Sequence, residues 1–153
     1  MQIVNLMTSD AITVGPNDKL ADAKRVMDEG GFRRVPVVDG GQLVGILTER
    51  DIRGHAGYLE STRVDAAMRS PVITVSPYNT VRDAATLMLK HKIGGLPVLA
   101  SGELVGIVTT SDLLKAFLAE GYGVFWGPRI LVEPRPQQRL LPGLSARLRK
   151  VFR

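Results

Sequence analysis

The residues best suited to chemistry are two copies of a Thr-x-x-Asp motif, Thr48 with Asp51 and Thr109 with Asp112, each directly after an apolar run. At a helix start, such a hydroxyl and carboxylate can cap the helix by reciprocal hydrogen bonds, which stabilises it by about 1 kcal/mol. The same carboxylate can accept hydrogen bonds from vicinal ribose hydroxyls, while the Thr hydroxyl and free N–H groups hold a phosphate. The motif alone leaves both interpretations open.

Both motifs belong to a longer internal duplication. Residues 7–53 align with residues 68–114 at a constant offset of 61 without a gap, and 18 of the 47 aligned positions are identical. Two copies are too few for an open solenoid, so we expect a closed pair. A closed pair has a pseudo-two-fold axis and two equivalent clefts.

Inside each copy the hydrophobic period changes in the same order. A β-branched run predicts a strand, apolar residues at helical spacing predict a helix, and two further apolar runs with a short Gly-containing connection predict a hairpin. Asp18 and Asn79 are the expected helix caps. The predicted strands are residues 11–14, 35–38 and 43–47 in the first copy and 72–75, 96–99 and 104–108 in the second. A last helix is expected to open at each Thr-x-x-Asp motif.

The predicted fold class is therefore α/β (α+β), with two β-α-β-β-α repeats packed about the pseudo-two-fold axis and an extended basic tail. We place the repeats at residues 1–60 and 61–120 and the tail at 121–153.

Composition restricts the class of protein. The chain of 153 residues is 44% hydrophobic and 23% charged, which is typical of a globular protein. No run is long enough to cross a membrane and the start lacks a secretory signal pattern, so we expect a cytoplasmic protein. There is no cysteine, and the two histidines, His55 and His91, lack carboxylate partners at metal spacing. We therefore expect no metal, no resident cofactor and no catalysis.

With these motifs in place, the chain resembles a tandem pair of CBS (cystathionine-β-synthase) domains, or Bateman module, from residue 3 to about residue 118. The resemblance lies in the strand-Pro-helix opening, the apolar-Pro-Val strand and the Gly-x-x-Thr-x-x-Asp turn, each present twice. It implies a regulatory homodimer that binds an adenine nucleotide (AMP, ADP or ATP) between the repeats.

The resemblance also implies the residues of each cleft. The first cleft would use Ile46, Thr48 and Asp51 for adenosine and Arg33 or Arg34 for phosphate, walled by Asn79 or Thr80, Ala84, Leu96 and Val98. The second would use Ile107, Thr109 and Asp112, walled by Asp18 or Lys19, Ala23, Val35 and Val37.

The copies differ where phosphate is expected. Arg33-Arg34 corresponds to Gly94-Gly95, so we expect unequal sites, with the Asp51 cleft preferring phosphorylated ligands. The other interpretation of the two arginines is a solvated loop.

The net charge of +5 is concentrated in the tail, where residues 129–153 hold seven Lys and Arg and one Glu. Three roles remain open for the aromatic and basic tail: docking on the protein's own dimer, binding an anionic membrane surface, or binding nucleic acid. The alternative function is therefore an interaction protein that uses its tail, with vestigial clefts.

Overall fold

The computed structural model describes residues 1–119, which comprise both copies of the repeat. The predicted tail, residues 121–153 with its basic part 129–153, lies outside the described residues. Within residues 1–119, no helix is long and apolar enough to cross a membrane.

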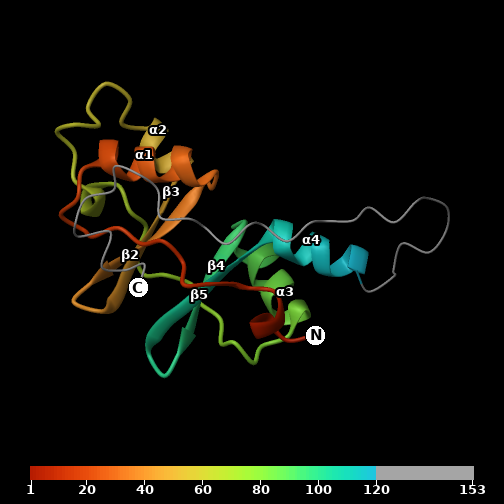
Figure 1. The fold of residues 1–153 in the computed structure, drawn as a ribbon. Helices are drawn as coiled ribbons and strands as arrows, with labels where there is room; N and C mark the ends of the chain where they lie inside the picture. The colour runs from red at the N-terminus through yellow and green to blue at the C-terminus, as the bar shows by residue number, and fades with distance from the viewer. Residues whose placement is uncertain (120–153) are drawn as a thin grey trace.

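The first copy consists of a helix, a hairpin and a short helix (Figure 1). These elements are α1 (Leu20–Gly30), β2 (Arg34–Asp39), β3 (Gln42–Thr48) and α2 (Glu49–Arg53). β2 and β3 are antiparallel, as the apolar runs on either side of Gly40-Gly41 predicted.

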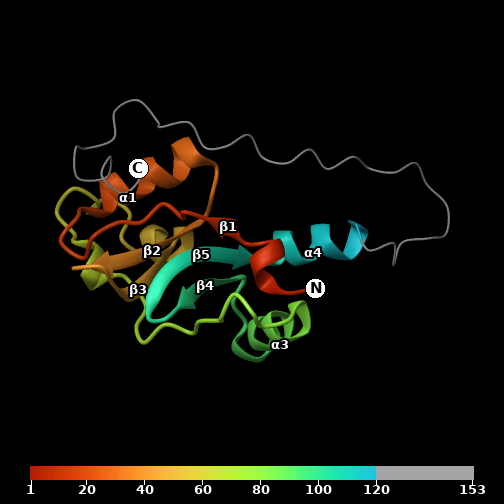
Figure 2. The same cartoon turned by 60° about the horizontal axis from the view of Figure 1, so that its bottom comes forward.

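The second copy repeats this order with α3 (Val81–His91), β4 (Gly95–Ala100), β5 (Glu103–Thr109) and α4 (Thr110–Ala119). Its hairpin has the same register, with Pro97 opposite Ile107 where the first copy has Pro36 opposite Ile46. The two copies lie side by side (Figures 1 and 2). Each combines helices with an antiparallel hairpin, so the predicted mixed α and β fold is confirmed.

The opening segments of the two copies are exchanged. Strand β1 (Thr8–Ser9) pairs with β5 of the second copy, so that Thr8 lies opposite Ile107 (Figure 2). The equivalent pairing in the first copy is the bridge between Ile46 and Arg69, two residues on opposite sides of the connection between copies. Each copy therefore completes the sheet of the other.

The hydrophobic cores show the same exchange. The 3-10 helix η1 (Ile3–Asn5) places Ile3 in the core of the second copy, and η2 (Val64–Ala66) places Val64 in the core of the first. Both side chains are fully buried. Residues 1–9 thus belong in space to the second repeat, although they precede the first along the chain.

The predicted strands over residues 11–14 and 72–75 are wrong as regular strands. Only Val14 and Val75 form bridges, parallel to Val37 and Val98. The pairing cannot extend past Val14, because the next N–H towards β2 would come from residue 16, which is a proline and has none. Residues 11–14 are nevertheless all buried, as expected for an apolar, β-branched run.

The predicted caps of α1 and α3 are also wrong. Asp18 accepts from Gly15, and the Asn79 side chain accepts from the N–H of Ser76 at 2.7 Å, so both stabilise the preceding turn. Helix α3 is capped by Thr80, whose hydroxyl and backbone N–H pair reciprocally with Asp83.

Candidate functional site

Both Thr-x-x-Asp motifs form capping boxes at the ends of the hairpins. In the first copy, the Thr48 N–H and hydroxyl donate to Asp51 Oδ2 at 2.9 and 2.7 Å. In the second, Thr109 makes the same two bonds to Asp112 Oδ2, both at 2.8 Å. All of these bonds use Oδ2, so the box leaves the other carboxylate oxygen, Oδ1, for a second partner.

The two Oδ1 atoms have different surroundings. Asp51 Oδ1 accepts from the guanidinium Nε of Arg69 at 3.0 Å, and the Asp51 side chain is 8% exposed. Asp112 Oδ1 has no hydrogen-bond partner among residues 1–119, because the residue equivalent to Arg69 is Thr8. Both carboxylates therefore cap a helix in the same way, but only the Asp112 carboxylate has an oxygen that can accept from a ligand without losing a partner.

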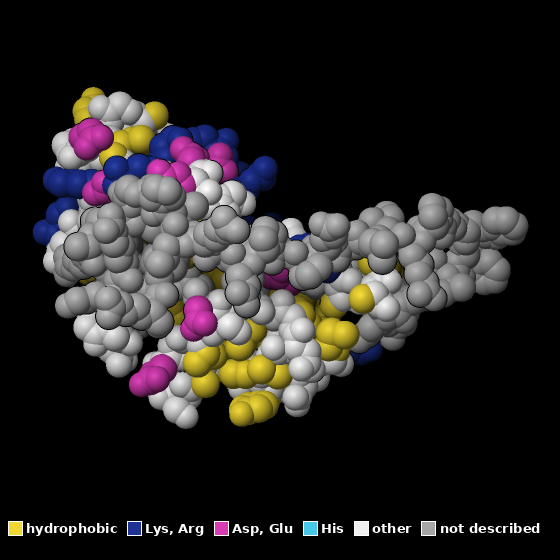
Figure 3. All heavy atoms as spheres, in the orientation of Figure 1, with side chains coloured by type: hydrophobic (Ala, Val, Ile, Leu, Met, Phe, Trp, Pro, Cys, Tyr) yellow, Lys and Arg dark blue, Asp and Glu magenta, His cyan; other side chains and the backbone are white. Residues whose placement is uncertain are grey.

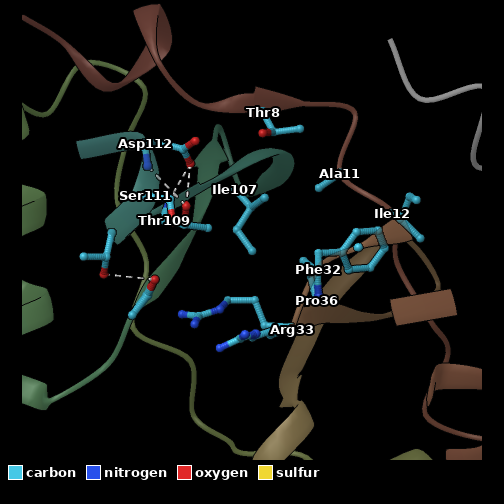
Figure 4. A pocket seen from close by; sticks show the side chains of 14 residues that line it. Thr8, Ala11, Ile12, Phe32, Arg33, Pro36, Ile107, Thr109, Ser111 and Asp112 are labelled. Atoms are coloured by element: carbon cyan, nitrogen blue, oxygen red, sulfur yellow. Dashed lines mark hydrogen bonds between the residues drawn. The ribbon is translucent and has the colours of Figure 1, made fainter. Parts of the chain in front are cut away.

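The Asp112 cleft, a cavity of about 450 Å³, lies between the two copies. Figure 4 shows Thr109, Asp112 and Ile107 of the second copy across from residues of the first. The first copy contributes four apolar residues, Ala11, Ile12, Phe32 and Pro36, together with Arg33 and Arg34. A carboxylate, an apolar wall and two cations thus share one cavity.

The Asp51 cleft is a second cavity, of about 470 Å³, on the other side of the arginine pair. Ile46 and Thr48 line it, but Asp51 does not, because Arg69 lies over its carboxylate. Half of the remaining lining residues are basic: Arg33, Arg34, Arg50, Arg53, Arg69, His91 and Lys92.

Arg33 and Arg34 line both cavities, so the expectation that only the Asp51 cleft has them is wrong. The reason for Arg34 is its place between the copies, against Gly94 and its own equivalent, Gly95. A Cβ added at Gly95 would lie 2.6 Å from Arg34 Cδ, so the side chain of Arg34 packs where glycine leaves room. Burial there, and then the charge of Arg33, lowers the pKa of the Arg34 guanidinium.

The predicted apolar walls lie in the two cores and line neither cleft. Each of these six side chains is fully buried: Ala23, Val35 and Val37 in the first copy, and Ala84, Leu96 and Val98 in the second. Successive residues of a strand point to opposite faces, so Pro36, between Val35 and Val37, lines the Asp112 cleft instead.

Sequence reasoning also missed the cleft residues that precede each first helix. Ile12 lines the Asp112 cleft and its equivalent Ile73 lines the Asp51 cleft. Their signal was the repeated Ile-Thr-Val, which was read only as a strand. The four residues near the starts of the first helices, Asp18, Lys19, Asn79 and Thr80, line neither of these two clefts.

Among residues 1–119, no group of three or more His, Asp and Glu side chains is placed to hold a metal ion. His55 Nδ1 lies 3.0 Å from the carbonyl oxygen of Asp51, within its own helical turn. His91 lines the Asp51 cleft among the cations.

The chain resembles known proteins in sequence and in fold. Inosine-5'-monophosphate dehydrogenase of Korarchaeum cryptofilum is 42% identical over 105 residues, which cover 68% of this chain and 22% of the enzyme. The chain thus spans about a fifth of the length of that relative.

Two solved structures superpose on most of the chain. The CBS domain pair of protein MJ0100, in complex with 5'-methylthioadenosine and S-adenosyl-L-methionine, has a TM-score of 0.73 and 28% identity, covering 78% of this chain and 98% of its own. CBSX2 in complex with AMP has a TM-score of 0.71 and 26% identity, covering 78% and 97%.

The CBS domain family matches residues 3–57 and again residues 64–119, so that both copies of the duplication are accounted for. The two matched segments begin at Ile3 and Val64, the two core residues that the copies exchange. The protein belongs to the CBS domain family, as a tandem pair of CBS domains.

Proposed function

We propose that this protein is a regulatory module that binds an adenine nucleotide, AMP, ADP or ATP, in the Asp112 cleft. The observation that carries the proposal is the Asp112 carboxylate, whose Oδ1 has no partner among the described residues while Oδ2 is fixed by Thr109. A positioned acceptor of this kind suits the vicinal hydroxyls of a ribose, which both donate hydrogen bonds.

The rest of the cavity supplies what the other parts of a nucleotide need. Ile12, Pro36 and Ile107 offer apolar surface for a purine ring, and the cavity of about 450 Å³ is in the usual range for small ligands. Arg33 and Arg34 offer guanidinium groups, which bind phosphate through charge-assisted, bidentate hydrogen bonds. That two relatives of the same fold are solved with adenosine-type ligands supports this ligand class.

We assign the Asp51 cleft a lower affinity for adenosine. A ribose there would have to displace Arg69 from Asp51, and this ion pair contributes about 1 kcal/mol, because the Arg69 side chain is 60% exposed. That the two clefts bind ligands unequally therefore stays a proposal. Its basis is now that Arg69 pairs with Asp51, whereas the equivalent residue beside Asp112 is Thr8.

We infer sensing rather than catalysis from the same geometry. The Thr109 hydroxyl donates to the Asp112 carboxylate and accepts from the Asp112 N–H, so both groups serve as the cap of α4. A ligand between two copies can shift their relative position only by binding one arrangement better than another. The cleft residues come from both copies, which meets that requirement.

Titration calorimetry with AMP on the wild type and on Asp112→Asn tests the proposal. The matched control is Asp83→Asn, because Asp83 closes the same kind of capping box at α3 and lines neither cleft. We expect Asp112→Asn to weaken AMP binding about tenfold or more, and Asp83→Asn to leave it unchanged. Equal AMP affinity in the wild type and Asp112→Asn contradicts the proposal.

We further propose that the module forms a homodimer through α3 and α4. The large apolar side chains on these helices include Leu89, Leu114 and Leu118, each more than half exposed. In Figure 3, hydrophobic side chains gather over the second copy, whereas Lys and Arg gather over the first. Light scattering of the wild type and of Leu114→Lys checks this, with a dimer expected for the first and a monomer for the second.

A further inference from the structure

The Asp51 cleft concentrates positive charge. Six cationic side chains line it, from α2, the start of β2, the end of α3 and the segment after η2: Arg33, Arg34, Arg50, Arg53, Arg69 and Lys92. The carboxylates within reach are those of Glu49 and Asp51. Six cations and two carboxylates leave an excess of four positive charges around a cavity of about 470 Å³.

Little of this charge is neutralised within the described residues. Arg33 lies 3.7 Å from Glu49, with both side chains at least half exposed, so this pair is weak. Arg69 is paired with Asp51. The side chains of Arg50, Arg53 and Lys92 form no ion pair with any of residues 1–119.

The positive charge is specific to the Asp51 cleft, because the second copy lacks most of these cations at the equivalent positions. At the equivalent positions of the second copy, Arg50 corresponds to Ser111, Arg53 to Leu114, and Glu49 to Thr110. The Asp112 cleft has the two shared arginines alone as its cationic lining. The pseudo-symmetry thus provides an internal comparison in which one cavity has six cations and its counterpart has two.

The side chain of Arg69 can either pair with Asp51 or turn towards an anion in the cavity. Two backbone hydrogen bonds with Ile46, at 2.9 and 3.1 Å, hold Arg69 at the edge of the cleft. Its side chain is 60% exposed, although its Nε is bonded to Asp51. A rotation about the side-chain bonds can therefore turn the guanidinium towards an anion in the cavity without moving the backbone.

We propose that the Asp51 cleft binds an oligophosphate chain through Arg50, Arg53, Arg69 and Lys92, without requiring an adenosine. A single phosphate monoester carries about two negative charges, so it offsets half of the excess, whereas a chain of three phosphates offsets all of it. Arginine suits this role because its guanidinium bonds two phosphate oxygens at once. The chain can belong to a nucleoside triphosphate or be inorganic.

The test is titration calorimetry of the full chain with inorganic triphosphate. The diagnostic variant is Arg50→Gln/Arg53→Gln, since both residues are exposed and lie one turn apart on α2. The matched control is Arg82→Gln/Lys90→Gln, which removes two exposed cations from α3 outside this cleft. Thermal unfolding of each variant verifies that it folds.

We expect the wild type and the control to bind triphosphate alike, and the diagnostic variant to bind at least about tenfold more weakly. AMP affinity in the Asp112 cleft should be the same in all three proteins, which separates this proposal from the proposed function. A second titration with ATP on Asp112→Asn distinguishes the sources of the chain. Equal affinity for ATP and inorganic triphosphate indicates that the phosphates alone are recognised.

Three results overturn the proposal. The first is no binding of inorganic triphosphate to the wild type. The second is an equal loss in the diagnostic variant and the control, which would indicate attraction by net charge alone. The third is binding of ATP to Asp112→Asn without binding of inorganic triphosphate, which would make adenosine a requirement of the Asp51 cleft.

Discussion

The guanidinium of Arg69 donates to the carboxylate of Asp51 at 3.0 Å, and the two residues come from different copies of the repeat. Thr8 occupies the place of Arg69 in the other cleft, beside Asp112. A single difference between equivalent positions thus engages one carboxylate and leaves an oxygen of the other without a partner in the described part of the chain.

Exchanging these two residues should exchange the properties of the clefts. Arg69→Thr leaves Asp51 Oδ1 without its partner, so we expect a second AMP molecule to bind per chain. Thr8→Arg places a guanidinium beside Asp112 and should weaken AMP binding about tenfold or more. Calorimetric stoichiometry and affinity measure both effects. Identical AMP titrations of Thr8→Arg and the wild type would show that the Asp112 carboxylate takes no part in binding.

Arg34 should couple the two clefts because it lines both. We expect Arg34→Met, which keeps an unbranched apolar stem over Gly94 and Gly95, to lower AMP affinity about tenfold and to leave adenosine affinity unchanged. In the wild type, saturating inorganic triphosphate should weaken AMP binding, since Arg34 also lines the Asp51 cleft and its guanidinium is attracted by an anion there. Competition titrations check this, and independent binding of the two ligands would contradict it.

Ile3 should be important for the stability of the second copy. Its side chain is fully buried against Ala84, Leu96 and Val98, so Ile3→Ala leaves a cavity and should lower the free energy of unfolding by about 2–5 kcal/mol. Denaturant unfolding measures the loss. Native-state hydrogen exchange locates it, and we expect faster exchange in β4 and β5 than in β2 and β3. Val4→Ala, an exposed neighbour, is the control.

Asp83 should make stability depend on acid pH. Hydrogen bonds from the backbone N–H and side chain of Thr80 lower the pKa of Asp83 below its ordinary value of 3.8. Because the pKa is lower in the folded protein, the stabilisation is complete above about pH 3.8 and is lost as the pH falls through the folded pKa. The difference in Tm between the wild type and Asp83→Asn should therefore be constant near neutral pH and shrink in acid. A constant difference down to pH 2 would contradict the assignment.

The sequence alone predicted the duplication, the hairpins and the capping boxes, because each depends on local pattern. Two apolar runs joined by a short Gly-containing turn determine a hairpin within about fifteen residues of chain. The exchange of opening segments depends on contacts between residues far apart, such as Thr8 with Ile107. No local pattern distinguishes pairing within a copy from pairing between copies.

The site was predicted in part for the same reason. Thr109 and Asp112 are neighbours on the chain and were found together, and Ile107 was implied by the resemblance to the CBS family. Ile12 and Pro36 reach the cleft from the other copy, and Arg34 lies at the axis where equivalent positions meet. Predicting these contacts required the arrangement of the copies as well as their sequences.

The exchange of opening segments also has a consequence for synthesis. Translation proceeds from the N-terminus, so Ile3 is made first, while its core partners Leu96 and Val98 are made more than ninety residues later. At about 5–20 residues per second, the interval is on the order of ten seconds. The first core closes earlier, as soon as Val64 has emerged. Ile3 thus precedes both copies in synthesis and finds its native contacts only after most of the second copy has been made.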